Sequence, residues 1–260
     1  MKMNSEGTIS EEAKQRVAKA FADATEMMHQ HGFDIGDGVQ VAVDPMLPFM
    51  GYTKPQGKKF RITVSGNAIE SGMLEGLLVH EMSHIYRMRT NHPSHDVRII
   101  NGVIRSLGES TLRYDYQQKI VGELVNNIED LYADDIAINV VRGGFVSEDQ
   151  LSSFFQGWVK DEPVETGDPI RDRWLNASIM ANNARAIRQM ARHEIEDTDG
   201  RAEAMNEQFL HLVSSEISTQ YEYFLNTMIN LKETITQEEY RRLLSEYLRR
   251  FLAATQASAL

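Results

Sequence analysis

Hydrophobic and polar positions follow two different periods along this chain, and they separate an N-terminal mixed region from a helical remainder. Residues 10–30 place apolar side chains at the i, i+3, i+4 and i+7 spacing of a helix that covers a core. Residues 39–43 form a short apolar run, and residues 59–65 alternate apolar with polar side chains, which is typical of a half-buried strand. We therefore expect a helix followed by two strands, with a proline-rich loop at residues 45–55 between the strands.

Helical spacing dominates the rest of the chain. It predicts consecutive helices at residues 70–89, 94–107 and 116–141. Pro93 ends the first of them, because proline cannot continue a helical hydrogen-bond ladder. Capping boxes, in which side chains satisfy the first amides of a helix, mark two later helix starts, at residues 147–150 and 236–239.

This order of elements predicts an α+β fold with two domains. Residues 1–145 are expected to form a domain with a small mixed sheet and a prominent helix, and residues 146–260 an all-helical C-terminal region. Glycines at positions 143 and 144 end the helix that precedes the boundary.

Composition narrows the possible chemistry. The 260 residues carry a net charge of −11, without a block of basic residues that would bind a phosphate backbone, so nucleic acid is not an expected partner. There are no cysteines, which excludes disulfides, thiolate zinc sites and a cysteine nucleophile. Any metal must therefore be held by His, Asp or Glu.

No apolar stretch approaches the roughly 20 residues of a membrane helix, and the N-terminus lacks the continuous apolar core of a signal peptide. We expect a cytoplasmic protein that does not bind a membrane.

Four of the eight histidines lie between residues 80 and 95, and two of them form a recognisable motif. His80-Glu81-Met82-Ser83-His84 is an H-E-x-x-H sequence on the predicted helix at residues 70–89. Four residues turn a helix through about 400°, so the two imidazoles project from one face and can share one tetrahedral ion. Glu81 lies about 100° round the helix, where it can act as the general base for a metal-bound water.

Two imidazoles without a thiolate suit a catalytic zinc, which usually has three protein ligands and a fourth position open to water. The predicted strand at residues 59–65 precedes the motif helix. We expect this strand to form an edge of the sheet and to hold an extended peptide by main-chain hydrogen bonds, while the helix presents zinc to the scissile carbonyl.

Acidic side chains on the predicted helix at residues 116–141 offer a third ligand. Asp130 and Asp134 lie about 40° apart on one face, beside small alanines that let the helix approach another backbone closely. One carboxylate can bind zinc, and the other can accept the ring N–H of a ligating histidine and fix its tautomer. Glu129 lies about 100° from Asp130, so either of these two acids is a candidate ligand.

These residues resemble the zincin metallopeptidases, specifically the gluzincin group of thermolysin-like, neprilysin-like and minigluzincin proteins. That group pairs H-E-x-x-H with a downstream helix that carries an E-x-x-A-D-type motif. Asp130-Leu-Tyr-Ala-Asp134 is similar to this second motif, with Asp where the family has Glu. The resemblance covers about residues 39–141. It implies a zincin-like catalytic domain in which Asp130 or the shifted Glu129 binds zinc and Asp134 orients a histidine.

His92 is a rival third ligand. SprT-like and WLM-like zincins similarly carry a third histidine on a turn and helix soon after H-E-x-x-H. The alternative for His92 and His95 is a loop that ends one helix, with Ser94 as the N-cap of the next. Four side chains are candidates for polarising a substrate carbonyl, namely His95, Tyr86, Tyr132 and Arg87.

The sequence therefore predicts a zinc-dependent peptidase that acts on a peptide or protein substrate. One alternative is a catalytically inactive zinc-binding regulatory or interaction protein with a zincin fold, which the Asp-for-Glu departure and the long helical region motivate. A further alternative is a latent peptidase whose cleft is covered by the C-terminal helices or the N-terminal segment.

Overall fold

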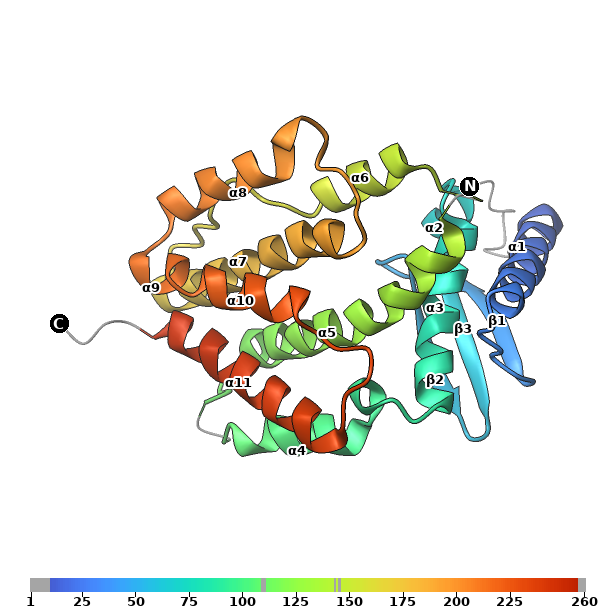
Figure 1. The fold of residues 1–260 in the computed structure, drawn as a ribbon, viewed down its shortest axis with the longest axis horizontal. Coiled ribbons are helices and arrows are strands. Elements are labelled where there is room, and N and C mark those ends of the chain that lie inside the picture. The colour runs from blue at the N-terminus through green and yellow to red at the C-terminus, as the bar shows by residue number, and fades with distance from the viewer. Residues whose placement is uncertain (1–9, 109–110, 143, 145, 257–260) are drawn as a thin grey trace. The chain divides into compact units, whose positions relative to one another are not determined.

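The computed structural model describes residues 10–108, 111–142, 144 and 146–256 of an α+β, mostly helical protein (Figure 1). Contacts group the chain into two compact units. Unit 1 comprises Met1–His92 with Tyr132–Ser147, and unit 2 comprises Pro93–Leu131 with Glu148–Leu260. This grouping does not show which segments can fold independently. The expected domain boundary at residue 145 therefore stays a prediction.

A three-stranded mixed sheet belongs to unit 1. β1 (Val39–Asp44) pairs in parallel with β3 (Lys59–Ser65), and β2 (Gly51–Gln56) pairs antiparallel with β3, which gives the order β1-β3-β2. The expected small mixed sheet is confirmed. Two expectations are wrong: β3 is the central strand because it pairs on both sides, and residues 51–56 form a strand rather than part of a loop.

Pro55 is compatible with β2 because β2 lies at an edge of the sheet. The backbone N–H of Ser65 donates to the carbonyl of Met50 at 2.8 Å. The antiparallel alternation then turns the backbone groups of Gly51, Thr53 and Pro55 away from β3, so a proline at position 55 loses no ladder bond. No further strand pairs with β2 in the described part of the chain, and Gly51 and Thr53 therefore line an open edge.

Three helices complete the N-terminal part of unit 1 (Figure 1). They are α1 (Glu11–Gln30), α2 (Gly66–Glu70) and α3 (Leu74–Arg89). α3 packs along β2 and β3, and α1 packs on α3 and β1. The single helix expected at residues 70–89 is wrong at its start, because Ser71 is extended and separates α2 from α3.

A close backbone approach fixes β2 against the motif helix. A Cβ atom added to Gly51 would meet the backbone oxygen of Thr63 at 3.0 Å and the side chain of Leu77, on α3, at 3.3 Å. A larger side chain would force the strand and the helix apart. Glycine at this position therefore lets the edge strand lie in contact with α3.

Unit 2 is helical, with α7 as its central helix. Its helices are α4 (Val97–Ser106), the first part of α5 (Asp115–Val141), α6 (Glu148–Gln156), α7 (Pro169–Arg192), α8 (Arg201–Leu212), α9 (Ser215–Ser218), α10 (Tyr221–Ile229) and α11 (Gln237–Thr255). α7 packs against α6, α8, α9, α10 and α11. The described residues from position 148 onward contain no strand, so the helical character expected for residues 146–260 is confirmed from position 148, whereas Val146 forms an isolated bridge with Arg142.

The helix ends test several sequence signals. Thr236 and Glu239 form the predicted capping box at the start of α11, and α6 begins directly after Ser147. Ser94 as an N-cap is wrong: residues 93–95 form a 3-10 turn, and Asp96 caps α4 by accepting from the N–H of Arg98 at 2.9 Å.

Two sequence expectations fall on positions for which the structure gives no account. Gly143, half of the predicted helix stop, and residues 1–9, where a signal peptide would begin, lie outside the described residues. Within the described helices, none has the length and apolar character needed to cross a bilayer.

Replacing Glu75 with Gln should weaken the attachment of α1 to α3. The guanidinium of Arg16 donates to both oxygens of Glu75, in one bond at 2.9 Å, and this hydrogen bonding lowers the pKa of Glu75. Because the pair is partly exposed, we expect E75Q to lower the free energy of unfolding by about 0.5–1 kcal/mol at neutral pH.

The effect should depend on pH in one direction. A lowered pKa in the folded state stabilises the fold above the unfolded-state pKa, and this contribution is lost as pH falls through the lowered value. Urea unfolding at neutral pH and at about pH 3 measures the difference. The control E12Q, which changes an exposed acid on α1, should match the wild type at neutral pH. Equal stability of E75Q and wild type at neutral pH would contradict the prediction.

Candidate metal centre

Helix α3 presents the two motif histidines side by side. The Nε2 atoms of His80 and His84 lie 3.1 Å apart, and the two rings meet nearly at right angles with their centres 4.7 Å apart. Both side chains are partly exposed, whereas Glu81 is buried. The i, i+4 spacing therefore brings both imidazoles to one point on the helix surface, as the sequence predicts.

Asp134 holds one of these histidines. Its Oδ1 lies 2.7 Å from Nδ1 of His80, and its side chain is buried. An ionised carboxylate only accepts hydrogen bonds, so we assign the imidazole proton to Nδ1, which leaves the lone pair on Nε2. This is the atom that faces His84. The structure thus brings Asp134 to the position that the sequence predicts for a carboxylate that orients a ligand.

Asp130 precedes Asp134 by one turn of the continuous helix α5. His80, His84 and Asp130 each offer one ligand atom, and these atoms lie within 4.8 Å of one another. They form the one group of three potential metal ligands among the described residues. Two imidazole nitrogens and one carboxylate oxygen can together hold a divalent cation.

The two competing third ligands lie outside this group. Burial, helped by the neighbouring charge of Asp130, raises the pKa of Glu129 to about 8. The ring of His92 packs against the ring of Tyr132, with the centres 4.6 Å apart. Of the three candidates from the sequence, the geometry therefore favours Asp130.

The candidates for polarising a carbonyl have other contacts. Arg87 is buried, and its Nε donates to the backbone carbonyl of Tyr132 at 2.9 Å. Tyr132 is itself fully buried, and Tyr86 makes an edge-on contact with Phe33. The Nδ1 of His95 lies 2.7 Å from the hydroxyl of Ser94. These contacts give Arg87 and Tyr132 a place in the packing of α3 against residues 132–141.

Sequence reasoning missed one residue near the candidate ligands. Arg185 on α7 is buried, and its Nη2 lies 3.1 Å from Oδ2 of Asp130. The signal that could have found it is a charged residue that continues a small apolar stripe, because Ala177, Ala181 and Arg185 follow one another at four-residue spacing. A charge on such a buried stripe requires a partner.

The edge strand is joined to the motif itself. The hydroxyl of Thr53 on β2 donates to the backbone carbonyl of Glu81 at 3.3 Å. The sequence expectation placed an edge strand at residues 59–65, and the structure instead brings β2 into this position. The backbone groups of Thr53 face the open edge, so an open strand edge runs beside the H-E-x-x-H helix.

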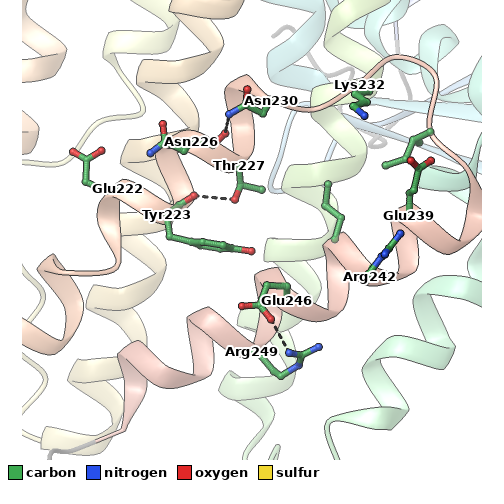
Figure 2. A pocket seen from close by; sticks show the side chains of 12 residues that line it. Glu222, Tyr223, Asn226, Thr227, Asn230, Lys232, Glu239, Arg242, Glu246 and Arg249 are labelled. Carbon is green, nitrogen blue, oxygen red and sulfur yellow. Dashed lines mark hydrogen bonds and ion pairs between the residues drawn. The ribbon is translucent and has the colours of Figure 1, made fainter.

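A separate groove in unit 2 carries no comparable chemistry. It lies between α10 and α11 and has a volume of about 910 Å³ (Figure 2). Its walls mix acidic and basic side chains, and Arg249 is paired with Glu246 at 2.6 Å. None of the predicted site residues and no histidine lines it.

Removing the carboxylate of Asp134 should weaken metal binding. We expect D134A to raise the Kd for zinc about 10–100-fold, because an unoriented histidine is a poorer ligand. D134N keeps an oxygen acceptor and should lose less. Competition with a chromophoric chelator measures the affinities, and E123Q, which changes an exposed acid on the same helix, is the control. Wild-type affinity in D134A would refute the assigned role.

Comparisons with known proteins give a family and no function. Neither the curated proteins nor the solved structures contain a match to this chain. One family model matches residues 12–253, which is nearly the whole sequence. The chain therefore belongs to the family of unknown function DUF5781.

Proposed function

We propose that this protein is a zinc-dependent peptidase. The observation that carries the proposal is the convergence of His80, His84 and Asp130, with ligand atoms within 4.8 Å of one another. The bond from His80 to Asp134 adds support, because a ligating histidine usually donates its second ring N–H to a carboxylate or carbonyl.

The donor set fits zinc in both chemistry and spacing. Tetrahedral zinc binds imidazole nitrogen at about 2.0–2.1 Å, which separates two such nitrogens by about 3.3 Å. The two Nε2 atoms are 3.1 Å apart, close to this value. Three protein ligands of the His and carboxylate type are also typical of catalytic sites with one position open to water.

The chain supplies a base beside these ligands. A bound zinc would polarise the scissile carbonyl and lower the pKa of its water to about 7. Glu81 follows His80 directly on α3, and we assign it to accept the proton of the attacking water and to pass it to the leaving amine.

The open edge of β2 supports a peptide as the substrate. Backbone groups of Gly51 and Thr53 face this edge, and an extended peptide can add to it as a further strand. Thr53 is also bonded to the carbonyl of Glu81, which links the proposed peptide-binding edge to the base that acts on the scissile bond. We therefore propose unstructured peptide segments as the substrate class.

The central test separates metal binding from hydrolysis. We expect the purified protein to bind zinc at about one ion per chain and to cleave an unfolded protein. E81Q should keep the zinc and lose at least about 100-fold in kcat, because the base is removed. H80A should lose the zinc as well as the activity.

Two outcomes would contradict the proposal. Wild-type protein that binds no zinc would refute the metal site. Stoichiometric zinc without Glu81-dependent cleavage would refute the peptidase and favour the alternative of a zinc-binding regulatory protein. Metal analysis by mass spectrometry and cleavage followed by gel or fluorescence give the two readouts independently.

Blocking the edge of β2 should impair substrate binding and leave the metal unaffected. T53P removes an N–H that faces the open edge, and the pairing with β3 needs no bond from it. Loss of one backbone hydrogen bond should raise KM for a peptide about tenfold.

T53V is the matched control, since it removes only the hydroxyl that contacts Glu81. KM should rise more in T53P than in T53V, with equal zinc affinity in both. Unchanged KM in a folded T53P would argue against the edge as the binding surface.

A further inference from the structure

The motif chemistry uses helices α3 and α5 and gives no role to the helices after residue 147. One side chain from that region nevertheless reaches a proposed ligand. Arg185 of α7 donates from Nη1 to Oδ1 of Asn127 at 2.6 Å and from Nη2 to Oδ2 of Asp130 at 3.1 Å. The C-terminal helices therefore supply a direct contact to the third member of the metal group.

We propose that Arg185 is a positioning residue that fixes the orientation of the Asp130 carboxylate for metal binding. The inference rests on the proposed zinc site and goes beyond it, because it assigns part of that site to the C-terminal region. It concerns metal affinity and coordination, which can be measured without any cleavage assay.

The geometry suits the planar fork of a guanidinium, which holds its donors in a fixed arrangement that an ammonium lacks. Asn127 and Asp130 are three residues apart on α5 and so lie on neighbouring positions of one face. The planar fork of Arg185 spans both side chains with two separate nitrogens. Trp158 lies under the guanidinium, with the ring centre 4.7 Å from Cζ. The arginine is therefore held on two edges and one face.

Because Arg185 is buried, losing its bonds to Asn127 and Asp130 would leave a charge without these partners away from water. Arg185 is only 7% exposed, and a buried guanidinium requires charged or polar partners. Asp130 forms an ion pair with it. A hydrogen bond to Oδ2 restricts rotation of the carboxylate about its last torsion, which sets the direction of both oxygens.

The proposed third ligand is Asp where the gluzincin motif has Glu, and this difference explains why a fixed carboxylate orientation would matter. Asp is one methylene shorter than Glu, so its carboxylate reaches less far from the helix axis and has less freedom to adjust to an ion. A ligand with a short reach must start in nearly the right orientation. Positioning by Arg185 supplies that orientation before the metal arrives.

An electrostatic role and a positioning role of Arg185 predict opposite changes in zinc affinity when the arginine is replaced by a neutral residue. A guanidinium beside a cation site repels the cation, so a purely electrostatic role predicts that a neutral residue at position 185 tightens zinc binding. A positioning role predicts that the same change weakens binding. Lysine separates the two further, because it keeps the charge and loses the fork.

The experiment measures zinc and cobalt binding to the full chain. We expect R185Q and R185K to raise the Kd for zinc about 10–100-fold, the range for partners that orient a ligand. The visible absorption spectrum of the cobalt-loaded protein should change in both, because it reports the coordination geometry. R192Q is the matched control: Arg192 lies on the same helix and donates to the backbone carbonyl of Leu231 at 3.0 Å. It should leave the zinc affinity and the cobalt spectrum unchanged.

Folded R185Q with unchanged or tighter zinc binding and a wild-type cobalt spectrum would overturn the inference, as would wild-type affinity in R185K.

If R185Q does not fold, as judged by circular dichroism, N127A gives the test, since it removes one anchor of the guanidinium and leaves Arg185 in place. We expect about a 3–10-fold weaker affinity in N127A, the loss of one hydrogen bond to a charged group, and an unchanged affinity would overturn the inference. Failure of the peptidase proposal is recognised separately, as wild-type protein that binds zinc without Glu81-dependent cleavage.

Discussion

The hydrogen bond between His80 and Asp134 is the constraint on which the candidate site depends. It joins the motif helix α3 to residues 132–141 through a partly buried contact of 2.7 Å. A second bond, from Nε of Arg87 to the carbonyl of Tyr132, joins the same segments about two helical turns further along α3. Two bonds at this separation fix the rotation of α3 as well as its distance, so both imidazoles face in a defined direction.

Packing of α3 fixes the direction in which its two histidines face. Val79, Met82 and Ile85 are fully buried, and β2 and β3 lie along the helix. His80 and His84 are partly exposed and share one face of the helix, four residues apart. Because the surrounding core is close-packed, the histidines cannot rotate away without a change in the whole helix. A metal site here would be preorganised by the fold rather than assembled by the ion.

Sequence reasoning succeeded where the relevant spacing is local. The i, i+4 arrangement of the two histidines follows from helix periodicity and appears in the structure. The contact of a histidine with Asp134, 54 residues away, is what the zincin resemblance implies, and it also appears. Sequence reasoning failed where pairing is non-local. The alternation in residues 59–65 indicates a strand but contains no information on its neighbours, so its central position was not predictable.

Two other features show the same limit. Pro55 argues against a strand unless the strand is known to lie at an edge, and that depends on which strands pair. Arg185 is 55 residues from Asp130 in the chain, and its role depends on how α7 packs. Helix boundaries near residues 71 and 96 also differ from expectation, since short extended and 3-10 segments lack a strong periodic signal.

The two acids on α5 have separate partners although they are one turn apart. Asp134 is bonded to His80 and Asp130 to Arg185. Each bond restrains the orientation of its own acid on α5. If Asp130 binds zinc, the ion's free energy of binding also stabilises this orientation of the helix, because an ion that binds only the native arrangement favours it by mass action. Under the role proposed for Arg185, the long helical region contributes to the metal site through this buried arginine, and orientation compensates for the shorter reach of Asp130.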